Sequence, residues 1–162
     1  MMAPLTLFIA LVLAISAAHK AHSPARLSNA AARLAGVSPP IGQLLLVLAG
    51  AIEAVAALCL TIPGTGAVGA AIAAAVWTTY AMALWRRRGE VLDCGCDLVN
   101  RPRAVDAGQI LRAALMATIA LTVVAWPSPP SLEALIPALG LLALYVGASE
   151  ILAIPRPAWR KA

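Results

Sequence analysis

The sequence predicts an all-α fold, a polytopic membrane helical bundle with a four-helix core and a fifth transmembrane helix. Hydrophobic residues make up 62% of the 162 residues and charged residues 12%, more apolar surface than one soluble core of that size can bury. Five segments have about the length of the roughly 20 apolar residues that a helix needs to cross a bilayer. The polar stretches between them are short, so we expect residues 1–162 to form one integral membrane domain.

The five expected transmembrane helices are residues 3–19, 41–62, 67–85, 108–126 and 132–154. Prolines, which remove a backbone donor, separate them: Pro39 precedes the second helix, Pro63 follows it, and Pro127 follows the fourth. The first segment has the apolar run of a secretory signal but lacks the positive amino end that such signals use. We therefore expect it to be retained as a helix.

Between the first two segments, residues 24–36 predict an interfacial helix that lies on the membrane. Ser23 can cap it, Pro24 suits its first position, and apolar residues line the side opposite Arg26 and Arg33. An ordinary loop is the alternative. His19, Lys20 and His22 stand at its start, where we expect contact with lipid head groups, and metal binding is the alternative.

The basic residues predict the orientation of the bundle. With five crossings, residues 20–40, 86–107 and the tail after 154 share one side and hold eleven of the twelve Lys and Arg residues, and the twelfth is Arg112. The positive-inside rule places that side in the cytoplasm. The net charge of +5 thus indicates membrane topology and contact with the lipid bilayer. The chain lacks the interleaved aromatic and basic residues that are typical of a nucleic-acid-binding surface.

Glu53, Arg112 and Glu150 fall inside apolar segments, where each is costly and is a candidate for pairing or function. By helical rise, Glu53 lies roughly 18 Å into its helix, near the middle of the bilayer. It is expected to be protonated, to hydrogen-bond to Thr78 or Thr79, or to join a polar pocket. Arg112 and Glu150 come out at similar depth, so we expect them to form a structural ion pair.

Cys94 and Cys96 form a C-x-C pair within Asp93–Asp97. Glycine between two thiols allows a small strained ring, and strained disulfides are good oxidants. The pair therefore fits a redox site, two metal ligands completed by His19 or His22, or a plain turn. Cys59, in the second helix, is expected to be a buried small hydrophobe.

These residues carry a resemblance to the MauE family, methylamine-utilisation membrane proteins related to DoxX. It covers roughly residues 5–125 and rests on "HK" after the first helix, Glu53, "RRRGEVLDCGCDL" after the third and "LRAAL" in the fourth. The resemblance implies a helical bundle of the bacterial inner membrane that acts with thioredoxin-like partners in disulfide formation or protein maturation. It implies Cys94 and Cys96 as the redox pair, accompanied by Lys20, Glu53 and Arg112.

The expected function is thus thiol-disulfide redox chemistry at Cys94 and Cys96, and a membrane quinone is a possible electron partner by analogy with other disulfide-forming bundles. A non-enzymatic assembly or metal-handling protein that uses the cysteines as ligands is the alternative, so enzyme status stays open. Chemistry on exported proteins would place the cysteines outside, whereas the charge distribution places them inside. We follow the charge distribution.

Overall fold

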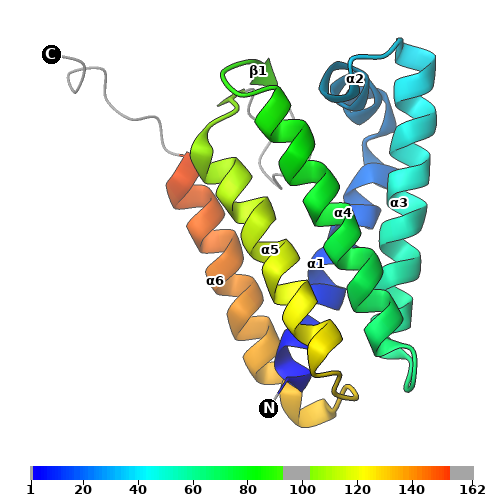
Figure 1. The fold of residues 1–162 in the computed structure, drawn as a ribbon, viewed down its shortest axis with the longest axis vertical. Helices are drawn as coiled ribbons and strands as arrows, with labels where there is room; N and C mark the ends of the chain where they lie inside the picture. The colour runs from blue at the N-terminus through cyan, green and yellow to red at the C-terminus, as the bar shows by residue number, and fades with distance from the viewer. Residues whose placement is uncertain (1, 93–102, 154–162) are drawn as a thin grey trace, which may run out of the picture.

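The computed structural model describes residues 2–92 and 103–153, which form an all-α bundle with one short two-stranded hairpin (Figure 1). Five helices are long and apolar enough to cross a membrane, which confirms the predicted fold class. They are α1 (Ala3–His22), α3 (Pro39–Thr61), α4 (Gly66–Arg86), α5 (Ala107–Ala125) and α6 (Leu135–Ala153), the last preceded by the 3-10 turn η1 (Leu132–Ala134).

Helix α1 is the central element, because it packs against α3, α4, α5 and α6. Its side chains Phe8, Ile9 and Leu13 are buried among alanines of α3, α4 and α5. Phe8 also meets Tyr145 of α6 edge to face, with ring centroids 5.9 Å apart. The small facing residues let the helix backbones approach closely, as in other membrane bundles.

Helix α2 (Pro24–Ala35) occupies the region where the sequence predicts residues 24–36 to be helical. Leu27 is buried on its inner side. The helix ends at Gly36, whose left-handed backbone (φ 72°) suits a residue without Cβ. Ser23 makes no side-chain cap, contrary to expectation, because its ψ of 54° departs from the extended backbone that aims a capping oxygen at the first turn.

Helices α3 and α4 touch backbone to backbone at Gly69. A Cβ built on Gly69 would lie 2.8 Å from both the Ala56 carbonyl oxygen and the Leu60 nitrogen. No larger residue fits there without a shift of one helix. Much of the rest of α3, and most of α6, presents exposed apolar side chains such as Leu44, Val55 and Leu144, a surface that suits lipid.

A two-stranded antiparallel hairpin joins α4 to α5. Strand β1 (Val91–Leu92) pairs with β2 (Arg103–Ala104) in the register Val91↔Ala104, and the Arg33 guanidinium of α2 donates to the Val91 carbonyl over 2.9 Å. The hairpin, α2 and the end of α4 lie together at one end of the bundle, whereas the amino terminus and the α3–α4 and α5–η1 connections lie at the other (Figure 1).

Candidate functional site

A buried ion pair joins α1 to α3. The Lys20 Nζ lies 2.9 Å from Glu53 Oε1 and 2.8 Å from Oε2. Only 1% of Glu53 and 9% of Lys20 is exposed. Hydrogen bonds between ionised groups are short and strong, and each ion lowers the cost of burying the other.

Two further side chains complete this polar cluster, which we call the Lys20–Glu53 cluster. The ammonium of Lys20 donates its third hydrogen bond to Ser16 Oγ at 2.7 Å, so all three of its donors are satisfied. Tyr80 of α4 donates its hydroxyl proton to Glu53 Oε1 over 2.7 Å, and its ring lies 5.7 Å from the Lys20 nitrogen. The cluster therefore ties α1, α3 and α4 together inside the bundle.

The sequence did not indicate this pairing, because the first helix was expected to end at residue 19, which left Lys20 in a surface loop. In the structure α1 continues to His22 and its last turn lies against the middle of α3. Lys20 packs beside Gly50, whose hypothetical Cβ would lie 3.7 Å from the lysine Cβ and Cδ. Gly50 and Glu53 are one turn apart on α3, so one face accommodates both the stem and the charge of Lys20.

Of the alternatives for Glu53, the structure shows a polar cluster with Lys20 and Tyr80, and the bond to Thr78 or Thr79 is absent. Both threonines are exposed, and the Thr79 hydroxyl donates to the Ala75 carbonyl of its own helix over 2.8 Å. Each helical residue turns about 100° from the one before it. That rotation turns Tyr80, the next residue, toward Glu53.

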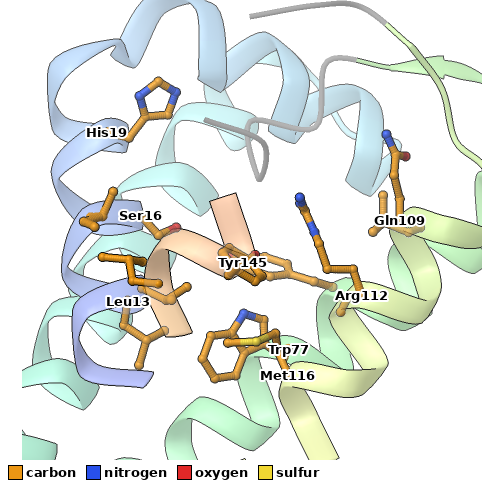
Figure 2. Close-up of a pocket in the computed structure, with 14 residues that line it drawn as sticks. Leu13, Ser16, His19, Trp77, Gln109, Arg112, Met116 and Tyr145 are labelled. Carbon is orange, nitrogen blue, oxygen red and sulfur yellow. The ribbon is translucent and has the colours of Figure 1, made fainter. Parts of the chain in front are cut away.

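A polar cavity lies beside this cluster, lined by α1, α4, α5 and α6 (Figure 2). Ser16 and Tyr80 belong both to its lining and to the Lys20–Glu53 cluster. The other polar side chains around it are His19, Trp77, Gln109, Arg112 and Tyr145. Figure 2 shows Ser16 and His19 facing Arg112 and Gln109 across the cavity, with Trp77 and Met116 at its base.

Gln109 is the unusual member of this lining. It stands in the first turn of α5, where its backbone N–H donates to the capping Asp106 carboxylate over 3.1 Å. Its side chain is 7% exposed, and its Oε1 atom has no hydrogen-bond partner among the residues that the structure describes. Buried acceptors are normally satisfied, so an orphan one marks a position where a donor is missing.

Arg112 is held by α6. Its Nη1 donates to Ser149 Oγ over 2.9 Å, and its guanidinium lies 5.5 Å from the centroid of the Tyr145 ring. The expected ion pair with Glu150 is not formed, and Glu150 is exposed. Ser149 and Glu150 are about 100° apart on the helix, so only Ser149 of these two faces α5.

Cys94 and Cys96 lie outside the described residues, whereas the two strands that flank their segment are described. Cys59 is a partly buried free thiol in α3. In residues 2–92 and 103–153 no three His, Cys, Asp or Glu side chains gather as a metal site would require. The alternative ligand set of His19 or His22 with the two cysteines includes residues outside these ranges.

Sequence reasoning thus named Lys20, Glu53 and Arg112 but missed Ser16, Trp77, Tyr80, Gln109 and Tyr145. Tyr80 and Gln109 are polar groups within apolar segments, which is a usable signal. Nothing local distinguishes Ser16 from the serine and threonine side chains that bond back to their own helix, such as Thr79 and Thr118.

Comparison with known proteins assigns this chain to a family. No curated protein and no solved structure matches the chain. A family model described as methylamine utilisation protein MauE matches residues 1–127, which include the Lys20–Glu53 cluster, Gln109 and Arg112. Tyr145 and Ser149 of α6 lie beyond the matched residues. Because the match covers well over half of the sequence, this multi-pass membrane protein belongs to the MauE family of methylamine utilisation proteins.

Proposed function

We propose that this protein is a thiol-disulfide redox protein of the bacterial inner membrane in which Cys94 and Cys96 cycle between dithiol and disulfide. It supports disulfide formation or maturation of partner proteins, and a thioredoxin-like protein is its exchange partner. The observation that carries the proposal is the closeness of the hairpin and the polar cavity. The hairpin that leads to the C-G-C segment joins the end of α4 to the start of α5, and Leu84 and Gln109, in the adjoining turns of these helices, line the cavity.

The anchoring of the hairpin supports this role. Val91 is held to α2 by Arg33, and Arg87 of the preceding turn donates to the Leu34 carbonyl of α2 over 3.3 Å. Cys94 follows Leu92, the last residue of β1, by two residues. The two strands that flank the C-G-C segment are therefore fixed to the bundle.

The exchange is balanced without any further reactant. A thiolate of the reduced partner attacks the Cys94–Cys96 disulfide, and a mixed disulfide forms between the two proteins. The second thiol of the partner then attacks the partner sulfur of this mixed disulfide and releases the cysteine of this protein as a thiolate. The partner loses two electrons and two protons and becomes a disulfide, and Cys94 and Cys96 become a dithiol. The reverse transfer uses the same intermediate.

Single replacements of the cysteines test this function. Cys94→Ser or Cys96→Ser leaves one thiol that cannot resolve the mixed disulfide, so each variant should accumulate a higher-mass adduct in cells that disappears on reduction. Cys59→Ser is the matched control and should behave as wild type. Absence of an adduct in both single variants, or uptake of one zinc ion per reduced chain without any disulfide cycling, would replace the redox proposal with the metal-handling alternative.

A further inference from the structure

A second cavity, which we call the α2–α4 groove, lies between α2 and the neighbouring helices α3 and α4. Its walls are mainly apolar and include Leu27 and Leu34 of α2, Leu45 and Ala49 of α3, and Ala83 of α4. The space inside it is about 220 Å³, more than the ~150 Å³ that admits a benzene ring in an engineered apolar cavity. The groove is therefore wide enough for a hydrocarbon chain, and its walls offer such a chain apolar contact.

The inner part of the groove meets the Lys20–Glu53 cluster. Lys20 and Tyr80 line it, but the three ammonium protons of Lys20 are already donated within the cluster, and Tyr80 donates its hydroxyl proton to Glu53. Thr79 also lines the groove and is exposed, so the groove reaches the outer surface of the bundle. A hydrocarbon chain that enters from this surface would cover the buried ions and keep water from them.

The part of the groove nearest the hairpin is basic. The guanidinium of Arg87 donates to the Leu34 carbonyl over 3.3 Å and lies where a Cβ on Gly36 would stand, so it rests against the end of α2. Arg33, next to Leu34, donates to the hairpin. A guanidinium has five N–H donors, and the described contacts of these two arginines use at most two in each. Both therefore keep donors for an anion.

Two further arginines stand beside them at the end of α4. Arg86 follows Ala83 by three residues and shares its side of the helix. Arg86 and Arg88 are exposed, and neither side chain has a hydrogen bond or ion pair among the described residues. Glu90 is the one carboxylate within residues 86–90, so the group of four arginines is strongly positive. The exposed ring of Trp85 indicates that this group lies at the level of lipid head groups.

We infer that the α2–α4 groove binds an anionic phospholipid, with one acyl chain between the apolar walls and the phosphate among the four arginines. Basic pockets between helices at the cytoplasmic face of a membrane are typical of sites for acidic head groups. A soluble anion would match the arginines but leave the apolar walls bare. A zwitterionic lipid would fill the walls but bring its own cation to the arginines. Charge complementarity and the apolar walls together therefore favour an anionic lipid.

Titration of the delipidated protein in detergent tests the charge preference. Palmitoyl-oleoyl phosphatidylglycerol should bind and raise the melting temperature, and phosphatidylcholine with the same acyl chains should bind at least about tenfold more weakly in native mass spectrometry. Arg86→Gln and Arg88→Gln should each weaken binding of phosphatidylglycerol about fivefold, the usual contribution of one basic residue near an anionic surface. Neither substitution should change the affinity for phosphatidylcholine.

Ala83→Leu tests the acyl-chain part of the site. The larger side chain occupies part of the groove, so it should weaken binding of phosphatidylglycerol about tenfold. The melting temperature of the lipid-free protein should not fall, because the leucine enters existing space. Ala31→Leu, from the α2 wall, should give the same loss and serves as the test if Ala83→Leu does not fold. Ala75→Leu is the matched control, since Ala75 is exposed on the same helix about 12 Å away, and it should bind lipid as wild type does.

The inference is wrong if phosphatidylglycerol and phosphatidylcholine bind equally well. It is also wrong if Ala83→Leu and Ala31→Leu leave binding unchanged, because the lipid would then adsorb to surface arginines without entering the groove. An equal loss in Ala75→Leu would contradict the location. Inorganic phosphate that raises the melting temperature as much as phosphatidylglycerol would identify a site for the free anion and overturn the assignment to lipid.

Discussion

At the scale of single residues, the Lys20–Glu53 pair combines a high cost of burial with complete hydrogen bonding. Both ions are removed from water, and Lys20 has an acceptor for each of its three protons, while Glu53 also accepts from Tyr80. A buried pair of this kind adds little net stability compared with apolar residues of the same size, but loss of one partner leaves an uncompensated ion. The cost of that ion is greater in a bilayer than at a surface.

Lys20→Met and Glu53→Gln are therefore expected each to lower the free energy of unfolding by about 3–5 kcal/mol. The double variant should lose much less than the sum, because neither charge is then buried alone. Unfolding in mild detergent, followed by circular dichroism, measures all three. Additive losses would contradict the close pairing.

The surface pair Arg87–Glu90 is the matched control. Its charged atoms lie 3.2 Å apart, but 31% and 48% of the two side chains are exposed. The same cycle with Arg87→Met and Glu90→Gln should give a coupling energy below about 1 kcal/mol. A coupling as large as that of the buried pair would show that burial is not what makes the Lys20–Glu53 interaction strong.

Arg112 gives a second prediction at this scale. Because its α6 partner is Ser149, the double-mutant cycle of Arg112→Met with Ser149→Ala should show coupling of about 1 kcal/mol. The cycle of Arg112→Met with Glu150→Gln should be additive, since Glu150 is exposed. A coupled Glu150 and an uncoupled Ser149 would restore the ion pair that helical rise alone suggests.

At the scale of helices, small residues decide how closely the elements approach. Gly69→Ala places a methyl group against the backbone of α3, so it should destabilise the bundle by about 1–3 kcal/mol. Gly147, in the interior of α6, has open space where its Cβ would stand. Gly147→Ala should therefore stabilise the protein by up to about 1 kcal/mol, the usual gain in helix propensity. Thermal melts that rank the two variants in the opposite order would contradict the observed α3–α4 packing.

Helix-level expectations succeed where apolar length is the signal and fail where a helix end is decided by contacts. Five apolar segments predict five long helices, and all are present. The end of α1 is different, because His19, Lys20 and His22 resemble a polar boundary in sequence. Burial of Lys20 against α3 extends the helix past that boundary, and no local pattern reports it.

At the scale of the whole molecule, the bundle has two chemically different ends. Asn29 of α2 is exposed at the end with the hairpin, and Ser131 is exposed at the opposite end, before η1. In a Cys59→Ala background lacking the C-G-C thiols, cysteines introduced as Asn29→Cys and Ser131→Cys should react with a membrane-impermeant maleimide from opposite sides. The charge rule predicts that Ser131→Cys labels in intact cells and Asn29→Cys only in inverted vesicles.

The native Cys94 and Cys96, after reduction, should label from the same side as Asn29→Cys. Labelling of the native pair from outside intact cells would reverse the predicted orientation and would agree with disulfide chemistry on exported proteins. Labelling of both introduced cysteines from one side would contradict the five-helix topology itself.

The sequence by itself determined the fold class, the number of long helices and the residues that carry unusual charge for a bilayer, because apolar length, proline position and buried charge are properties of single segments. Only the tertiary structure decided that Lys20 pairs with Glu53, that Ser149 rather than Glu150 is the α6 partner of Arg112, and that Gln109 Oε1 has no donor among the described residues. The physical reason is that partners come from different helices, and their meeting depends on the rotation and depth of each helix in the bundle. A 100° turn from one residue to the next changes the partner.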